Sequence, residues 1–143
     1  MCGEPDRTLG FVMHVLFVED DPMNRRVVKD MLSVAGVEMS EAVDAPTGLA
    51  MLDAQSFDLI LMDLRMPGMD GLAAIRHIRA RADALATVPI ILVTADTSLD
   101  LQARCNTAGA DDLLRKPVAM TLLFDAIAKA ISQRPASAAA MLA

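Results

Sequence analysis

Acidic side chains follow two apolar runs of the sequence, at the point where each run ends. Glu19 and Asp20 come directly after the run at 14–18, and Asp63 closes the run at 57–62. Two bare carboxylates about 4 Å apart repel by roughly 4 kcal/mol at an effective dielectric near 20, so three that converge need a neutralising partner. A hard divalent ion prefers an oxygen-only, acid-rich and partly open site. These residues predict a Mg²⁺ site with a water-rich shell.

A hydroxyl and an ammonium group follow two further apolar runs. Thr94 comes at the end of the run at 88–93, and Lys116 follows the short run at 112–115. Together with a metal ion, these two groups could hold a phosphoryl group. The Asp63 carboxylate is then the natural acceptor, because aspartate can attack phosphorus and form an acyl phosphate when cations shield the incoming charge.

The elements that must position these residues alternate strictly along the chain. Short apolar, β-branched runs predict strands at 14–18, 57–62 and 88–93. The amphipathic segment EMSEAV predicts an edge strand at 38–43, and a short strand is expected near 112–115. Segments with helical spacing of apolar residues predict helices at 22–35, 47–54, 71–81, 99–107 and 119–132. Such alternation favours a parallel sheet with helices on both faces, because parallel neighbours need a crossover helix. The predicted fold is a doubly wound, flavodoxin-like α/β fold, (βα)5, with strand order 2-1-3-4-5.

This fold would bring the acids together. In an open α/β sheet the chemistry gathers at the carboxyl ends of the strands, in the crevice where the winding direction reverses. In the order 2-1-3-4-5 that crevice lies between the first and third strands, which end in Glu19, Asp20 and Asp63. The next acid, Asp21, precedes Pro22, and this pair is typical of a helix start. We therefore interpret Asp21 as a helix cap.

Length and composition indicate one globular unit. The 143 residues fit one domain, and 54% hydrophobic with 22% charged residues is typical of a folded chain. We expect the domain to span 13–132, with a flexible extension at 1–12 and a flexible tail at 133–143. Cys2 and Cys105 have no metal-ligand spacing and are expected to be free thiols.

Charge and aromatic content argue against nucleic-acid binding. The net charge is −6 and the pI about 4.7, whereas a nucleic-acid binder normally shows a basic face. The chain has no Trp, no Tyr and four Phe, so stacking platforms for bases are lacking. No apolar run reaches the roughly 18 to 20 residues of a membrane span. We expect a cytoplasmic protein that binds neither nucleic acid nor membrane.

Four short motifs together resemble the receiver domain of response regulators in two-component signalling. They are LFVEDDP at 16–22, MDLRMPGMDG at 62–71, VTA at 93–95 and RKP at 115–117. The resemblance runs from about residue 14 to 132, and the motifs stand in the family's order. It implies a signalling phosphoacceptor, similar to a single-domain chemotaxis regulator, rather than an enzyme.

The resemblance also implies the partners of the site. Asp63 would receive a phosphoryl group from a sensor histidine kinase, and Asp20 and Asp63 would bind Mg²⁺ directly. Glu19 would bind Mg²⁺ mostly through water, and the backbone carbonyl of Arg65 would be a further ligand. Output would pass to a downstream target protein or to a histidine phosphotransfer protein.

Thr94 and Lys116 would contact the phosphoryl group, and Pro117 would follow a cis peptide bond, as in the family. Many receivers carry an aromatic residue three positions before the lysine, where this chain has Leu113, so the aromatic half of the family's switch is missing. Arg65 would lie at the mouth of the site and affect water access or partner fit.

Three alternatives remain at this point. The chain could be the receiver of a hybrid histidine kinase or a phosphorelay intermediate rather than a stand-alone regulator. A haloacid-dehalogenase-type phosphatase also uses a strand-end aspartate, but it wants a second aspartate where this chain has Arg65. A flavodoxin-like cofactor binder would carry a Ser/Thr-rich loop where this chain has EDDP.

Overall fold

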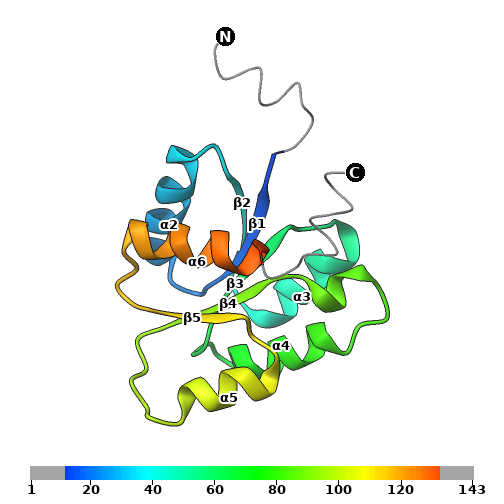
Figure 1. Ribbon diagram of the computed structural model, residues 1–143. Helices are drawn as coiled ribbons and strands as arrows, with labels where there is room; N and C mark the ends of the chain where they lie inside the picture. Colours follow the sequence, from blue (N-terminus) through cyan, green and yellow to red (C-terminus); the bar gives the residue numbers. More distant parts are fainter. Residues whose placement is uncertain (1–11, 133–143) are drawn as a thin grey trace.

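Five parallel strands form one sheet, and the computed structural model describes residues 12–132 of the chain (Figure 1). The spatial order is β2-β1-β3-β4-β5, which confirms the predicted order. The strands are β1 (His14–Val18), β2 (Glu38–Ala42), β3 (Leu59–Asp63), β4 (Ile90–Thr94) and β5 (Asp112–Arg115). The described residues include only residue 12 of the expected N-terminal extension. The rest of that extension, with Cys2, and the expected tail at 133–143 lie outside them.

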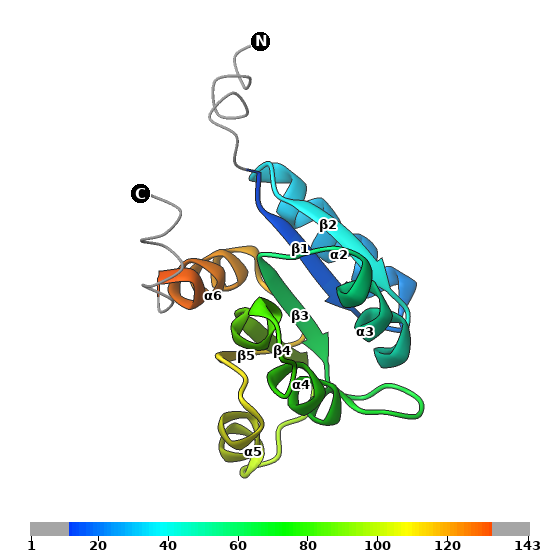
Figure 2. The ribbon, with the colours of Figure 1, turned by 90° about the vertical axis from the view of Figure 1, so that its right-hand side faces the viewer.

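Helices cover both faces of the sheet, as Figures 1 and 2 show. They are α2 (Pro22–Val34), α3 (Ala45–Ala54), α4 (Gly71–Arg79), α5 (Leu101–Ala108) and α6 (Met120–Ser132). Buried residues of α2 and α6 pack on one face, and those of α3, α4 and α5 pack on the other. No helix within residues 12–132 is long and apolar enough to cross a bilayer.

The central strands are apolar on both sides because both of their faces are covered. All five residues of β3 are buried, and so are all five of β4. Along β3, Leu59 and Leu61 join the core under α2 and α6, whereas Ile60 and Met62 join the core on the opposite face. A strand buried on both faces reads as a continuous apolar run, which is why the sequence located the central strands well.

The boundaries differ from the predicted ones by a few residues, for local reasons. Helix α3 begins at Ala45 rather than 47, because the Asp44 side chain accepts a hydrogen bond from Thr47 N at 2.8 Å and caps the helix. Helix α4 ends at Arg79 rather than 81, and a short 3₁₀ helix at Ala84–Thr87, which the sequence analysis did not predict, follows before β4. The third strand includes Asp63 itself, so the acid is fixed by sheet pairing.

Candidate functional site

Three carboxylates converge at the carboxyl end of the sheet. Oxygen atoms of Glu19, Asp20 and Asp63 all lie within 4.8 Å of one another. Glu19 follows β1 and is 1% exposed, Asp63 ends β3 and is 4% exposed, and Asp20 faces solvent. The crevice measures about 420 Å³ and is lined by Glu19, Asp20, Asp21, Asn24, Asp63, Arg65, Thr94, Ala95, Asp96 and Lys116. All the candidate site residues of the sequence analysis therefore share one crevice.

Lys116 bridges the two buried acids. Its Nζ atom lies 2.8 Å from Glu19 Oε1 and 3.0 Å from Asp63 Oδ1. Burial by itself would lower the pKa of Lys116, but its close contacts with the carboxylates of Glu19 and Asp63 outweigh burial and raise the pKa. The ammonium is thus held charged beside the carboxylate that the sequence marks as the phosphoacceptor.

Burial has the largest influence on the pKa of the two buried acids. It raises the pKa of Glu19 and of Asp63, and Lys116 lowers both to a smaller extent. The negative charge of Asp20 raises the pKa of Asp63 further. One ammonium therefore does not neutralise the cluster, and a second cation would stabilise its ionised form.

The cluster fits a hard divalent ion. Its ligand atoms are carboxylate oxygens, it is open on the side of Asp20, and Glu19 Oε1 is a buried oxygen without a well-directed hydrogen bond, although Lys116 lies near it. Mg²⁺ prefers this kind of donor set and keeps several of its waters. The residues present are therefore suited to Mg²⁺.

The hydroxyl of Thr94 enters the same crevice. Thr94 ends β4, is 1% exposed, and accepts a hydrogen bond from Asp96 N at 3.0 Å through Oγ1. It keeps its own hydrogen to donate. Its carbonyl accepts from Lys116 N at 2.8 Å, so the end of β4 is tied to the segment that carries the lysine. The peptide bond between Lys116 and Pro117 is cis, as the resemblance implied.

The loop after Asp63 folds back closely on the strand end. Asp70 caps α4 by accepting from Ala73 N at 2.9 Å, and Gly71 N donates to the carbonyl of Leu64 at 2.8 Å. A Cβ atom on Gly71 would lie 2.2 Å from the carbonyl oxygen of Asp63, closer than any side chain tolerates. Only glycine fits at position 71, and this contact fixes the backbone that presents the candidate phosphoacceptor.

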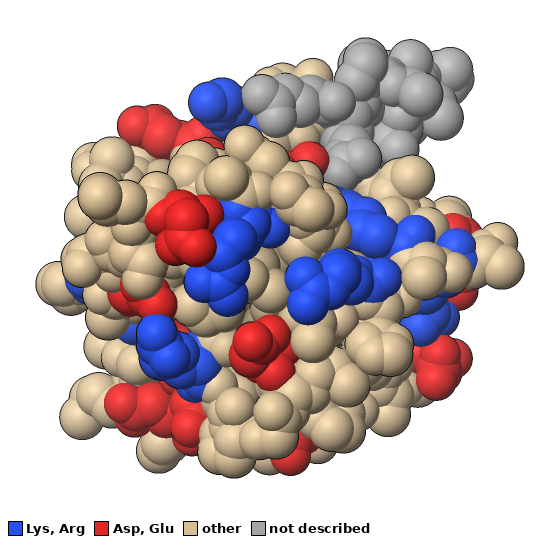
Figure 3. Space-filling view, turned by 90° about the horizontal axis from the view of Figure 1, so that it is seen from below, with Lys and Arg blue, Asp and Glu red and all other residues tan. Residues whose placement is uncertain are grey.

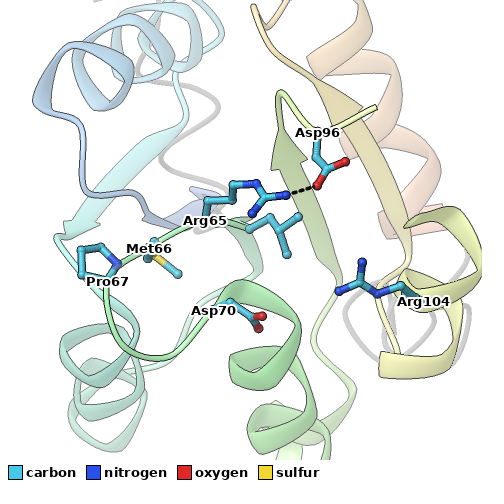
Figure 4. Close-up of a pocket in the computed structure, with 7 residues that line it drawn as sticks. Arg65, Met66, Pro67, Asp70, Asp96 and Arg104 are labelled. Atoms are coloured by element: carbon cyan, nitrogen blue, oxygen red, sulfur yellow. Dashed lines mark hydrogen bonds and ion pairs between the residues drawn. The ribbon is translucent and has the colours of Figure 1, made fainter. Parts of the chain in front are cut away.

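Arg65 lies at the mouth of the crevice, where the sequence placed it, but its partner was not foreseen. Its guanidinium donates a hydrogen bond at 2.5 Å to Oδ2 of Asp96, which lies in the loop after β4 (Figure 4). The Arg65 side chain is 76% exposed, whereas that of Asp96 is 5% exposed. Hydrogen bonds from Ser98 and then from Arg65 lower the pKa of Asp96 to about 2. The pair stays charged at neutral pH and joins the two loops that flank the site.

A second cavity of about 370 Å³ opens beside this ion pair. The residues that line it come from the loop after β3 up to the N-cap of α4, from the loop after β4 and from α5: Leu64, Arg65, Met66, Pro67, Asp70, Asp96 and Arg104. In Figure 4, Arg104 of α5 points into this cavity from the side opposite Pro67. Arg65 and Asp96 both line this cavity and the acid crevice.

Comparisons with known proteins decide the family. The family model described as "Response regulator receiver domain" matches residues 15–128. The chain belongs to the response regulator receiver domain family. It is 34% identical to the chemotaxis protein CheY of Pseudomonas aeruginosa over 118 residues, which are 82% of this chain and 94% of CheY. The predicted resemblance is confirmed.

Receiver domains of larger proteins are equally similar. The chain is 34% identical to the sensor histidine kinase RcsC of Salmonella typhimurium over 116 residues, 81% of this chain but 12% of RcsC. A solved receiver domain of the sensor histidine kinase PA1611 from Pseudomonas aeruginosa, with a magnesium ion in its active site cleft, superposes with a TM-score of 0.77. It is 34% identical and covers 85% of this chain and 99% of its own. This receiver thus resembles both stand-alone regulators and parts of hybrid kinases.

The surface of the receiver is mixed in charge on the face that Figure 3 shows. Lys and Arg groups lie across the middle of this face, and acidic groups interrupt and surround them. A nucleic-acid binder would present a more continuous basic surface.

Proposed function

We propose that this receiver accepts a phosphoryl group on Asp63 from a sensor histidine kinase and signals as a stand-alone regulator. The observation that carries the proposal is the contact of 3.0 Å between Lys116 Nζ and Asp63 Oδ1, inside a cluster of three acids. This arrangement places a nucleophilic carboxylate beside a fixed cation. The protein acts as a phosphoacceptor that assists its own reaction, rather than as an enzyme with a separate substrate.

The proposed phosphoryl transfer takes place in one step. An oxygen of the Asp63 carboxylate attacks the phosphorus of a phosphohistidine whose ring is protonated at its other nitrogen. The O–P bond forms as the N–P bond breaks, the electron pair of the N–P bond stays on nitrogen, and histidine leaves as a neutral imidazole. Lys116 and the Thr94 hydroxyl each contact an oxygen of the transferred group. Mg²⁺ would be held by the carboxylates of Asp20 and Asp63, by the Arg65 carbonyl and, through water, by Glu19. When bound, it would supply positive charge that offsets the charge of the incoming group.

The proposed output face lies on α5, β5 and α6. Phosphorylation adds about −1.5 to −2 charges, enough to draw Thr94 and the loop after β4 toward Asp63. A groove beside this region is lined by Asp112, Leu113, Leu114, Arg115, Leu122, Asp125, Ala126 and Lys129. Leu113 is half-buried there and packs against the core, so a shift of β4 would reach the groove through packing rather than through an aromatic ring.

Phosphoryl uptake from acetyl phosphate tests the proposal. We expect the wild-type chain to gain the mass of one phosphoryl group in the presence of Mg²⁺, because the acids and Lys116 can then stabilise the transferred charge. With EDTA in place of Mg²⁺, uptake should fall at least tenfold, measured by intact mass spectrometry over time. Equal uptake under both conditions would show that the acid cluster does not act through a divalent ion.

A receiver within a hybrid kinase or a phosphorelay is the second candidate, favoured by the similarity to RcsC. In that case the aspartyl phosphate would pass to a histidine phosphotransfer protein. Incubation of the phosphorylated chain with such a protein separates the two candidates. Rapid transfer of the phosphoryl group to the histidine phosphotransfer protein supports the phosphorelay role. Slow decay of the aspartyl phosphate to inorganic phosphate supports a stand-alone regulator.

Replacing Arg65 with alanine is expected to speed loss of the phosphoryl group by about two- to tenfold, on the order of 1 kcal/mol in barrier. The reason is that the Arg65 side chain and its pair with Asp96 cover the mouth of the crevice and limit water access. The measurement is the decay of the phosphorylated mass after acetyl phosphate is removed. Arg104→Ala, in the neighbouring cavity, should decay at the wild-type rate. Equal rates for Arg65→Ala and wild type would refute this role.

A further inference from the structure

Arg25 of α2 connects the acid loop to the edge strand of the sheet. One terminal nitrogen, Nη1, donates to the backbone carbonyl of Glu19 at 2.8 Å. Its Nε atom donates to Glu41 Oε1 on β2 at 2.9 Å. The Arg25 side chain is only 14% exposed, so it is packed into this position and not extended into solvent. The guanidinium therefore holds the two segments in a fixed relation.

Glu19 is held in place through both its backbone N–H group and its backbone carbonyl. Glu19 N donates to the carbonyl of Ala42 at 2.9 Å, at the end of β2, and the Glu19 carbonyl accepts from Arg25. The same carbonyl belongs to the peptide unit that leads into Asp20. The orientation of this peptide unit affects the direction in which the Asp20 side chain points. Within residues 12–132, no hydrogen bond or ion pair of the Asp20 side chain itself is seen that would hold it in place. Arg25 is thus placed to influence Glu19 and Asp20, two of the three acids of the β1–α2 loop.

Glu41 orients Arg25 from the outer side. It lies opposite Phe17 in the register of β1 and β2, and its second oxygen accepts from Lys29 at 3.2 Å. The hydrogen bond from Arg25 is the main reason why the pKa of Glu41 is lowered, with Lys29 as a lesser cause. Arg25 is therefore the principal partner of Glu41, and Lys29 supports the pair without reaching the acid loop.

We propose that Arg25, oriented by Glu41, is a positioning residue for the divalent-cation site, acting through the Glu19 carbonyl to set the placement of Glu19 and Asp20. The proposal rests on the Mg²⁺ site of the proposed function. Partners that orient the ligands of a metal site typically change affinity by about 10- to 100-fold when they are removed. Arg25 makes this kind of contact, although it touches no carboxylate of the acid cluster in the contacts described.

Titration of Mg²⁺ into the full chain without a phosphoryl donor tests the proposal. The dissociation constant is read from the amide resonances of Asp20 and Asp63 by NMR. We expect Arg25→Met to weaken Mg²⁺ binding about tenfold and to shift the Asp20 amide even before Mg²⁺ is added. Arg25→Lys should recover only part of the affinity, because one ammonium cannot reach the carbonyl and Glu41 in the same planar geometry.

Two neighbours on the same helix serve as matched controls. Arg26→Met removes an exposed arginine that pairs with Asp30, and Lys29→Met removes the other cation beside Glu41. Both should bind Mg²⁺ within about twofold of wild type, because neither touches the acid loop. If Arg25→Met does not fold, Glu41→Gln carries the same test, with an expected loss smaller than that of Arg25→Met but larger than the twofold limit of the controls, because Glu41 acts only through Arg25.

The outcomes separate the two claims. Wild-type affinity in a folded Arg25→Met, or tighter binding as expected if Arg25 merely repelled Mg²⁺, would overturn the positioning role and leave the proposed function standing. Equal losses in Arg25→Met and Arg26→Met would also overturn it, because the effect would then come from a general disturbance of α2 and not from the contact with the Glu19 carbonyl. If the wild-type chain does not bind Mg²⁺ at all, the proposed function fails together with the inference.

Discussion

Replacing Asp63 with asparagine is expected to abolish phosphoryl uptake from acetyl phosphate. The amide has nearly the shape of the carboxylate, so the strand end and the close contact with Gly71 should persist. It has no anionic oxygen to attack phosphorus, however, and cannot form an acyl phosphate. The loss should therefore be complete within the detection limit of intact mass spectrometry, with a cooperative thermal unfolding transition retained.

Asp21→Asn is the matched control for this prediction. Asp21 lines the same crevice, but its side chain accepts a hydrogen bond from Met23 N at 2.9 Å and caps α2. Asparagine is also a good helix cap, so the substitution should change neither fold nor uptake. Uptake by Asp63→Asn at the wild-type level, or loss of uptake in Asp21→Asn alone, would move the acceptor away from Asp63.

Lys116→Met is expected to slow phosphoryl uptake by about 10²- to 10³-fold, the usual loss when one fixed donor to the transferred group is removed. Lys116 is the cation that lies 2.8 Å from Glu19 and 3.0 Å from Asp63. Without it, burial would raise the pKa of both acids further, and less of Asp63 would be ionised at neutral pH. The measurement is the initial rate of uptake at saturating Mg²⁺.

The rate defect of Lys116→Met should shrink as the pH rises. A carboxyl group with a raised pKa is protonated at low pH and becomes the nucleophilic carboxylate as the pH passes its pKa. The missing contact to the phosphoryl group remains missing at every pH, so recovery should be partial. Lys129→Met, an exposed lysine on α6, should react at the wild-type rate throughout. A Lys116→Met rate within twofold of wild type would rule out this role for the lysine.

The fold and the set of site residues could be predicted because both depend on strand ends. Buried parallel strands read as apolar runs, and in the order β2-β1-β3-β4-β5 their carboxyl ends meet at one edge. Glu19, Asp63, Thr94 and Lys116 each stand at or directly after such an end. The sequence therefore indicated their proximity, although their chemical roles remain predictions.

The contacts between side chains of different elements could not be predicted. The pairs Arg65–Asp96 and Arg25–Glu41 join residues 31 and 16 positions apart, and their formation depends on how far a long side chain reaches across a loop. The Asp-Ala-Pro start of α3 did contain a signal, since Asp44 precedes a proline in the first turn, as Asp21 does. An aspartate shortly before a proline, the pattern that predicts the start of α2 at Asp21, therefore also marks the start of α3 at Asp44.

The central claim is that Asp63 itself carries the phosphoryl group, and chemical trapping tests it most directly. The chain is phosphorylated with acetyl phosphate and Mg²⁺, treated with borohydride, which reduces an aspartyl phosphate to homoserine, and digested for tandem mass spectrometry. We predict homoserine at position 63 and at no other aspartate. Homoserine at position 20 or 21, or none in a sample whose intact mass shows phosphorylation, would contradict the account.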